Sequence, residues 1–252
     1  GAAPRIHIVD GETAVLAVQR QALVADNPLL GEDRLLFLVR KPGGGTPGLP
    51  QNWQGNSSIA RMGYDTAVCT VDMAAVRRAA ASDGVPNVGD LADAIATVYH
   101  SDSAFVGDMC PSFDARKLLF SMPDAGNNQR FEVWEIGVDG DGLRVVTAGC
   151  DGDYDNYDAC YLPNGEVMFV SSRCYQAVPC TGGDHVGLLY LSDADGGNVR
   201  QLTFDQDHSW NPTVLNDGRI VYTRWEYNDT PHYFSRILFG MNPDGTRQMA
   251  LY

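Results

Sequence analysis

The sequence has few basic residues and no long apolar run. Lysine and arginine together number 18, against 32 aspartates and glutamates, so the formal net charge is −14. Nucleic acids bind clustered basic side chains, and we therefore expect no nucleic-acid partner. No segment approaches the roughly 20 apolar residues of a membrane-spanning helix, and we expect no membrane span. The acidity indicates a strongly hydrated surface.

Familiar motifs of catalysis and cofactor attachment are also missing. The sequence has no Gly-x-Ser-x-Gly elbow and no Ser-His-Asp constellation, and the glycine run at 43–45 lacks the Lys-Ser/Thr of a phosphate-binding loop. Cys-x-x-Cys-His, the attachment motif of c-type haem, does not occur. We therefore expect no covalent haem in this chain and no catalysis by the chain alone.

What the sequence does contain is a repeat of about 50 residues. Strands follow turns of the Asp-Gly-Arg type at residues 117–122, 167–171 and 220–223. In each unit a second apolar strand ends in an acidic turn, and a third segment reads Leu-Arg-Val-Val-Thr, Val-Arg-Gln-Leu-Thr or Arg-Gln-Met-Ala. Residues 32–71, from Glu32-Asp33-Arg34 to the segment 65–71, look like a degenerate first copy with a long insertion. Strands joined by Asp-Gly turns are typical of antiparallel meanders.

This repeat predicts an all-β fold, a β-propeller of the six- or seven-bladed type with about four blades in this chain. A single four-stranded unit cannot bury both of its faces, so the units must stack side by side. We expect a helical lead-in over residues 1–30, with its helix at 12–27, and propeller blades over 31–252. Because the fourth copy stops after its third strand, we also expect an incomplete propeller from a longer protein. A sandwich of two sheets is the alternative, although it does not require periodic turns.

The repeats resemble those of the bacterial TolB-type propeller, in which an Asp-Gly-Arg turn precedes a Phe-rich strand and an Asp-x-Asp-Gly turn precedes Arg-x-Leu-Thr. Four longer segments are similar to the middle domain of the hydrazine synthase alpha subunit: residues 155–169, 174–180, 202–212 and 222–239. This resemblance implies a bacterial propeller outside the cytoplasm, in the periplasm or the extracellular space. It also implies an alternative function beside c-type haems, with the haem supplied from outside this chain.

Six cysteines are present, and six cysteines permit 15 pairings. Spacing does not choose among the pairings of Cys69, Cys110, Cys150 and Cys160. Cys174 and Cys180 differ, because they flank five residues directly after a predicted strand. A disulfide between them would stabilise this crossing by about 2 kcal/mol in the chain-entropy model, and it would indicate an oxidising compartment. Two buried free thiols are the alternative.

An acidic stretch offers a candidate calcium site with four carboxylates: Asp151, Asp153, Asp155 and Asp158. Calcium takes several oxygen ligands, and alternating aspartates in one loop can supply them. The stretch has Asn156 in place of the glycine of a calcium loop, and it lacks the closing acid. A solvated turn at the entry to a blade is therefore the alternative.

A second candidate site consists of polar and aromatic residues in the predicted loops: His208, Trp210, Arg224, Trp225, Glu226, His232 and Tyr233. Tryptophan, tyrosine and arginine dominate binding hot spots, so we expect these residues on a binding surface. In the alternative, Trp225 packs between blades while Arg224 pairs with Glu226. His185, His208 and His232 offer a further metal site, although no two of them have short ligand spacing.

Together these features predict a rigid scaffold outside the cytoplasm that binds a ligand or a protein within a larger assembly. Its partners would be other subunits or further domains of the same protein. The alternative is the propeller domain of an oxidoreductase related to the hydrazine synthase alpha subunit. The sequence names neither the ligand nor a reaction.

Overall fold

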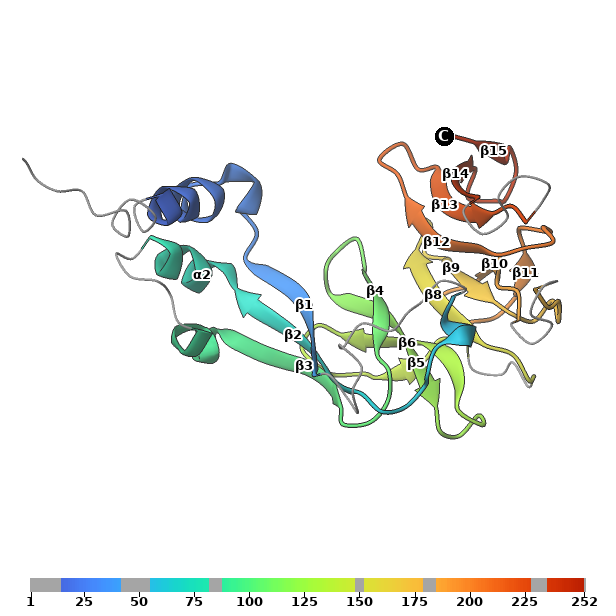
Figure 1. Cartoon of the computed structure of the whole chain (residues 1–252), viewed down its shortest axis with the longest axis horizontal. Coiled ribbons are helices and arrows are strands. Elements are labelled where there is room, and N and C mark those ends of the chain that lie inside the picture. Colours follow the sequence, from blue (N-terminus) through green and yellow to red (C-terminus); the bar gives the residue numbers. More distant parts are fainter. Residues whose placement is uncertain are drawn as a thin grey trace, which may run out of the picture. The chain divides into compact units, whose positions relative to one another are not determined.

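The computed structural model describes residues 15–41, 55–81, 88–147, 152–178, 185–227 and 235–251. In these ranges fifteen strands form four sheets, and strands that follow one another in the chain pair within each sheet (Figure 1). We call the sheets blades 1 to 4. No helix in the described ranges is long and apolar enough to cross a membrane.

The blades differ in strand number. Blade 1 has three strands: β1 (Arg34–Lys41), β2 (Asp65–Asp72) and β3 (Ile95–Ser101). Blade 2 has β4 (Gly107–Pro111), β5 (Lys117–Asp124), β6 (Arg130–Gly137) and β7 (Arg144–Val145). Blade 3 has β8 (Asn156–Tyr161), β9 (Val167–Ser171), β10 (Leu188–Ser192) and β11 (Arg200–Gln201). Blade 4 has β12 (Ser209–Val214), β13 (Ile220–Trp225), β14 (Arg236–Met241) and β15 (Met249–Ala250). The chain is therefore an all-β propeller with a short N-terminal helix, and the predicted fold class is confirmed.

The sequence repeat is a repeat of core positions. Phe120, Phe169 and Tyr222 lie at the same place in the second strand of blades 2, 3 and 4, and all three side chains are fully buried. Each pairs with an aromatic residue of the third strand: Trp134, Tyr190 or Phe239. Burial of one such ring contributes about 1.5–3 kcal/mol. The recurrent aromatic position thus supplies the apolar centre of each blade.

The Arg-x-x-Thr pattern in blades 2 and 3 is explained by recurring hydrogen bonds. Thr147 Oγ1 accepts from the backbone N–H of Val133 at 3.1 Å, and Thr203 Oγ1 accepts from that of Leu189 at 2.9 Å. The arginines reach the next blade: Arg144 donates to the carbonyl of Ala194 at 2.8 Å, and Arg200 donates to that of Asp244 at 3.1 Å. One motif therefore closes its own blade and joins it to the following one.

In blade 4 the Arg-Gln-Met-Ala segment lies two residues earlier, relative to the last strand, than the matching segment of blade 3. Leu251 N donates to Leu238 O at 2.8 Å, as Leu202 N does to Leu189 O. Leu251, rather than Met249, is therefore the counterpart of Leu202. The sequence match places Arg247 at the position of Arg200. In the structure Ala250 corresponds to Gln201, so the match is wrong by two residues.

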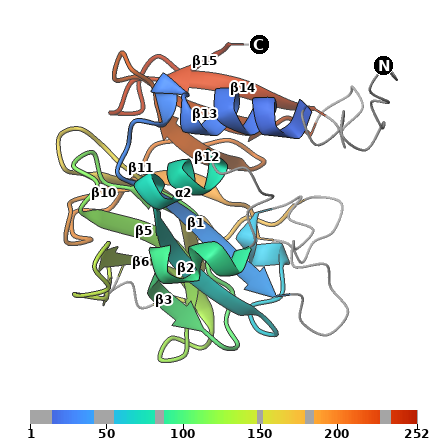
Figure 2. The same ribbon diagram turned by 90° about the vertical axis from the view of Figure 1, so that its left-hand side faces the viewer.

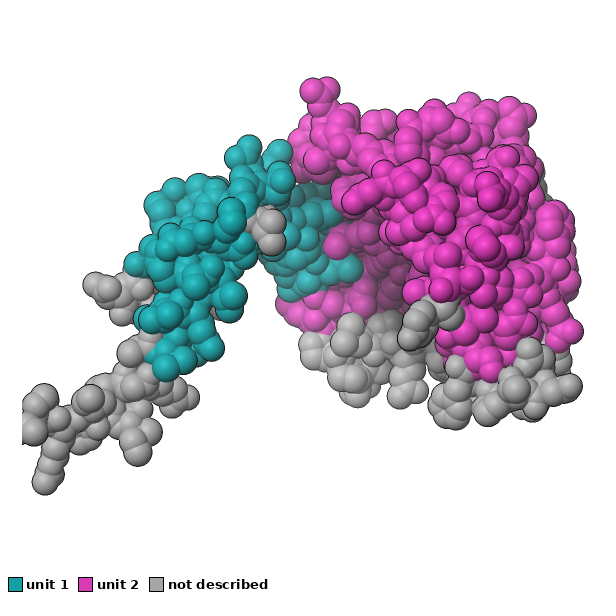
Figure 3. Space-filling view, turned by 90° about the horizontal axis from the view of Figure 1, so that it is seen from above, with its two compact units in different colours: residues 1–39, 67–99 teal, residues 40–66, 100–252 magenta. Residues whose placement is uncertain are grey.

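The chain divides into two compact units, residues 1–39 with 67–99 and residues 40–66 with 100–252, coloured separately in Figure 3. The helices of the first unit face the viewer in Figure 2. They comprise helical residues 15–20, η1 (Gln21–Ala25), η2 (Pro28–Leu30), α2 (Met73–Ala80) and η4 (Val88–Ala94). The second unit contains η3 (Asn56–Ser58).

Local chemistry explains the boundaries of these helices. Asp72 caps α2 by accepting a hydrogen bond from Ala74 N at 2.8 Å. Helical residues 15–25 fall within the predicted helix, whose first three residues lie outside the described ranges. Because α2 packs against η1 and η4, this unit holds more than the predicted lead-in of residues 1–30.

Candidate functional site

The first strands of blades 2, 3 and 4 share the same interruption. The pairing of β4, β8 and β12 with the next strand shifts between residues 107 and 110, 157 and 160, and 210 and 213. Just inside each shift, Asp108, Asp158 and Asn211 have positive φ angles of 53°, 52° and 55°. Asp and Asn adopt this left-handed conformation more readily than other non-glycine residues. A β-bulge redirects its side chains, so the three bulges present these groups at equivalent positions.

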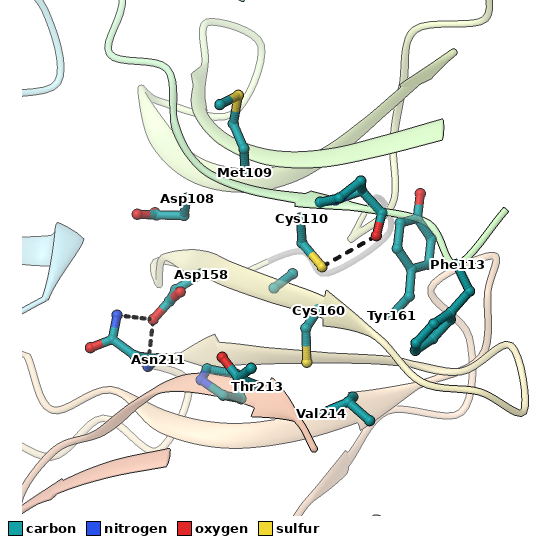
Figure 4. A pocket seen from close by; sticks show the side chains of 13 residues that line it. Asp108, Met109, Cys110, Phe113, Asp158, Cys160, Tyr161, Asn211, Thr213 and Val214 are labelled. Carbon is teal, nitrogen blue, oxygen red and sulfur yellow. Dashed lines mark hydrogen bonds between the residues drawn. The ribbon is translucent and has the colours of Figure 1, made fainter. Parts of the chain in front are cut away.

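A cavity of about 460 Å³, here called the inner-strand cavity, lies between these three strands (Figure 4). Its lining comprises Asp108, Met109, Cys110, Pro111, Phe113, Asp158, Ala159, Cys160, Tyr161, Asn211, Pro212, Thr213 and Val214. Figure 4 shows the carboxyl groups of Asp108 and Asp158 on one side of the view and the rings of Phe113 and Tyr161 on the other. The sulfur atoms of two cysteines lie between them.

Hydrogen bonds between neighbouring blades hold the polar side of the cavity. Asp158 Oδ2 accepts from the backbone N–H of Asn211 at 2.6 Å and from its Nδ2 at 3.1 Å. The backbone N–H of Asp158 donates to Ser121 Oγ at 2.8 Å. Asp108 in turn is hydrogen-bonded by Ser121 and by Asn56 Nδ2. The hydrogen-bond partners of the two residues thus come from blade 2 (Ser121), blade 4 (Asn211) and η3 (Asn56).

Both carboxyl groups resist ionisation. Burial and the charge of Asp108 raise the pKa of Asp158 to about 8. Burial also raises the pKa of Asp108, although its hydrogen bonds to Ser121 and Asn56 and the charge of Arg40 act in the opposite direction. Coupled carboxyl groups do not both ionise readily, because each charge opposes the other. The pair therefore retains a proton at neutral pH.

A second set of equivalent positions lies two residues further along each inner strand. Cys110, Cys160 and Thr213 resume the strand pairing after the bulge. Burial raises the pKa of both thiols, and the charge of Asp158 acts in the same direction. Cys110 Sγ donates a weak hydrogen bond to Pro111 O at 3.6 Å, and neither cysteine forms a disulfide.

The chemistry of the lining favours a positively charged occupant. Among the described residues that line the cavity there is no lysine, arginine or histidine. Carboxyl, thiol, amide and hydroxyl groups remain, and their attraction for a cation is strengthened in a partly dry cavity. Across the described part of the chain, no three His, Cys, Asp or Glu side chains group as a metal site.

The predicted calcium ligands have separate partners. Asp155 is buried, pairs with Arg61 Nη2 at 2.9 and 3.0 Å, and accepts from Phe131 N at 3.0 Å. Asp153 pairs with Arg130, and Asp158 lines the inner-strand cavity. The alternative of a solvated turn does not describe Asp155.

Asp151 lies outside the described residues. Calcium binding by the acidic stretch therefore stays a prediction.

The aromatic part of the predicted binding surface is buried. His208, Trp210 and Trp225 are 0%, 8% and 2% exposed. The His208 ring stacks on Trp225 at 5.9 Å, and its Nδ1 accepts from Gly187 N at 2.9 Å. Burial and the nearby charge of Arg236 lower the pKa of His208 to about 3, so this imidazole is neutral. These three rings pack and support blade 4 rather than face solvent.

The charged part of that surface is paired. Arg224 contacts Asp205 at 2.8 Å and Glu226 at 2.7 Å, and its guanidinium lies 4.8 Å from the ring centre of Phe239. This packing and pairing is the alternative that the sequence offered. His232 and Tyr233 lie outside the described residues.

The structure does not support the predicted disulfide, because Cys174 is a free thiol that donates a hydrogen bond to Val186 O at 3.4 Å. Its expected partner Cys180 lies outside the described residues, so the pairing itself stays a prediction. His185 forms an isolated bridge with Ala177, and in the described part of the chain it belongs to no group of three metal-binding side chains.

Sequence reasoning singled out one residue of the inner-strand cavity, Asp158, and missed the others. A signal was present, because Asp108-x-Cys110, Asp158-x-Cys160 and Asn211-x-Thr213 recur at intervals of 50 and 53 residues. The aspartates suggested a loop, whereas the structure has bulged strands.

Comparison with solved structures defines the class of protein. Hydrazine synthase of Kuenenia stuttgartiensis matches with a TM-score of 0.59 and 14% identity over 87% of this chain and 32% of that chain. A putative TolB from Agrobacterium tumefaciens matches with a TM-score of 0.51 and 17% identity over 74% and 56%. A puromycin-hydrolysing peptidase of Mycobacterium tuberculosis matches with a TM-score of 0.53 and 13% identity over 87% and 29%.

At these identities the likeness shows the fold alone, and the protein is a β-propeller. The chain spans 32% of the hydrazine synthase chain and 56% of the TolB chain. No family model and no curated protein sequence matches it.

Proposed function

We propose that this propeller is an extracytoplasmic binding scaffold whose inner-strand cavity receives a cationic group, either of a small ligand or of a partner's lysine or arginine side chain. The observation that carries the proposal is the Asp108–Asp158 pair, which faces a cavity without a basic lining residue in the described chain. Coupled carboxyl groups with raised pKa values in a cleft are typical of functional sites.

The size and polarity of the cavity support the same conclusion. Its volume of about 460 Å³ lies in the range of ligand pockets, which hold a few placed polar groups among apolar ones. An ammonium or guanidinium group would meet the carboxyl groups, while Phe113 and Tyr161 would contact its apolar stem. A bound cation stabilises the ionised carboxylates, so binding tightens as the pH rises through the pKa of Asp158, about 8.

Titration calorimetry with methylguanidinium and butylammonium tests the proposal. Binding at pH 9 should be tighter than at pH 6, and Asp158→Asn should weaken it about tenfold. Asp217→Asn is the matched control, because this exposed turn residue undergoes the same change of charge outside the cavity. Equal affinity of wild type and Asp158→Asn, or no binding of either probe at pH 9, would refute the cationic site.

The exposed face of blade 4 supports a role within a larger assembly. Leu238 and Leu251 are 48% and 41% exposed, whereas their counterparts Leu189 and Leu202 are 0% and 3% exposed. In blades 2 and 3 this face is covered by the next blade. We infer that a further blade or subunit covers it in blade 4.

The extracytoplasmic location rests on the resemblance of the repeats to TolB-type propellers. Non-reducing peptide mapping of protein isolated from its native compartment tests the location. A Cys174–Cys180 linkage would support it, and two free thiols would contradict it.

A further inference from the structure

One hydroxyl group joins the two carboxyl residues of the inner-strand cavity. Ser121 Oγ is fully buried on β5, accepts a hydrogen bond from Asp158 N at 2.8 Å, and is hydrogen-bonded to the carboxyl group of Asp108. The bond to Asp108 lowers the pKa of that carboxyl group, which is the effect of a donated hydrogen on a carboxylate. Asn56 Nδ2 donates a second hydrogen bond to Asp108 Oδ2. Two donors therefore favour the ionised form of Asp108.

The hydrogen bonds of Asp158 leave one of its carboxyl oxygens unused. Asp158 Oδ2 accepts both hydrogen bonds from Asn211, which the dashed lines in Figure 4 mark. Among the described residues no group donates to Asp158 Oδ1. A carboxyl group that keeps its proton is a hydrogen-bond donor. Because Oδ2 already accepts from two donors, the proton lies on Oδ1, and Asp158 presents a donor to the cavity.

The two aspartates therefore differ in what they offer a ligand. Asp108 carries the negative charge of the pair, and the charge of Arg40 favours this assignment. Arg40 donates hydrogen bonds to Val106 O and Thr66 Oγ1, and it is not among the described residues that line the cavity. The polar side of the cavity thus combines one anion with one hydrogen-bond donor.

We propose that the inner-strand cavity selects organic cations that carry a hydrogen-bond acceptor near the ammonium or guanidinium group, with the cation on Asp108 and the acceptor on Asp158. Amino ethers, amino alcohols and amino amides have this pattern. A simple alkyl cation satisfies Asp108 but leaves the donor of Asp158 without a partner, and an unpaired polar group in a cavity reduces affinity. This inference rests on the proposed function, because it names the class of cation for the same cavity.

The groups that face Asp158 decide how this selection varies with pH. Among the described residues the titratable ones are a carboxyl group, two thiols and a phenol: Asp108 and Cys110 on β4, and Tyr157 and Cys160 on β8. β5 and β12 contribute the neutral partners Ser121 and Asn211. The glutamates of β6 are hydrogen-bonded to Asn156 and Tyr161 instead. Burial raises the pKa of both thiols and of the phenol, so Asp158 is the group that changes from donor to acceptor as the pH rises through about 8.

A pair of isosteric probes tests the inference. Butylguanidinium and 2-methoxyethylguanidinium differ only in the replacement of one methylene group by an ether oxygen, which accepts hydrogen bonds and donates none. Both probes stay charged throughout the experiment, as guanidinium groups do. Titration calorimetry at pH 6 should show about tenfold tighter binding of the ether probe. This preference should be lost at pH 9, where Asp158 is ionised and has no hydrogen to donate.

Two substitutions separate the donor of Asp158 from its charge. Asp158→Asn replaces the hydroxyl donor by an amide N–H, so it should keep the preference for the ether probe at pH 6 and extend it to pH 9. Asp158→Gly removes the donor, suits the positive φ of 52°, and should abolish the preference at both pH values. Asp217→Asn is the control outside the cavity and should behave as the wild type does.

The outcomes separate this inference from the proposed function. Tight binding of both probes with equal affinity at pH 6 would overturn the inference and leave the cationic site standing. A preference for the ether probe that survives in Asp158→Gly would also overturn it, because the donor would then lie on another residue. If neither probe binds at pH 9, the cationic site is refuted and this inference with it. If a variant does not fold, the comparison of the two probes on the wild type decides.

Discussion

Replacing Asp158 by asparagine should reduce the pH dependence of stability and stabilise the protein above neutral pH. The pKa of Asp158 is about 8 in the folded chain, against roughly 3.9 for an unfolded aspartate. Between these values the folded state holds a proton that the unfolded state has lost. The free energy of unfolding of the wild type therefore falls as the pH rises, by at most about 1.4 kcal/mol per pH unit for one proton. From pH 5 to pH 7 the loss reaches up to about 2.7 kcal/mol.

Asparagine suits this position structurally. It tolerates the positive φ of 52°, and its side-chain oxygen can accept the hydrogen bonds that Asn211 donates. Urea unfolding followed by tryptophan fluorescence between pH 5 and pH 9 measures the effect. The free energy of unfolding of the wild type should fall over this range. That of the variant should fall less steeply, by the slope that one bound proton contributes.

Asp217→Asn provides the control for this experiment. Hydrogen bonds from the backbone and side chain of Arg219 lower the pKa of Asp217, so its ionised form favours folding. The stability that ionised Asp217 contributes is lost only when the pH falls through its lowered pKa. The unfolding free energy of the control should therefore vary with pH as that of the wild type does from pH 5 to pH 9. Parallel curves for the wild type and Asp158→Asn would refute the argument that burial holds a proton on Asp158.

Four further predictions follow from the same structure. Thr203→Val should lower the free energy of unfolding by about 1–3 kcal/mol, because it leaves the buried N–H of Leu189 unpaired; a change below about 0.5 kcal/mol in urea unfolding would contradict this. Leu251→Glu should change stability by less than about 0.5 kcal/mol, whereas Leu202→Glu should prevent folding; equal losses would show that the blade 4 face is covered in the chain alone. The protein purified together with its native partners should lack a Soret band. A Soret band would favour the haem-containing alternative. Metal analysis after dialysis should find calcium if the acidic stretch binds it, and calcium-free protein would refute that prediction.

The second and third strands of each blade could be predicted from sequence. The segment 167–171 coincides with β9, and 117–122 lies within β5. These strands are apolar on both sides and follow turns that contain positive-φ residues, such as Gly165 and Gly218. Turn chemistry and burial therefore indicate the same boundaries.

The inner strands could not be assigned in this way. β4, β8 and β12 are each interrupted by a bulge, and the interrupting residues are Asp or Asn, which are typical of loops. The aspartates before and within β8 therefore predicted an acidic loop. A repeat alignment shows that these residues recur. It does not show the shift in strand pairing that directs their side chains toward the cavity.

The opposite error concerns His208, Trp210 and Trp225, which were expected on a binding surface and are buried. Trp225 was expected in a loop, whereas β13 extends to this residue and its ring stacks on His208. Residue type favours recognition at such a cluster, but burial decides between recognition and packing. The sequence carries no direct measure of burial where a strand ends, so both interpretations were open until the strand boundary was known.

The candidate site is a consequence of the repeat itself. Intervals of 50 and 53 residues bring Asp108, Asp158 and Asn211 together only because each blade begins with the same bulged strand. The same spacing brings Cys110 and Cys160 into one lining. A blade needs neither carboxyl groups nor thiols at these positions to fold, since Asn211 and Thr213 occupy them in blade 4 within the same geometry. The carboxyl groups of blades 2 and 3 are therefore not required by the blade geometry, which supports the proposed cationic site, whereas the two thiols pack in the hydrophobic core.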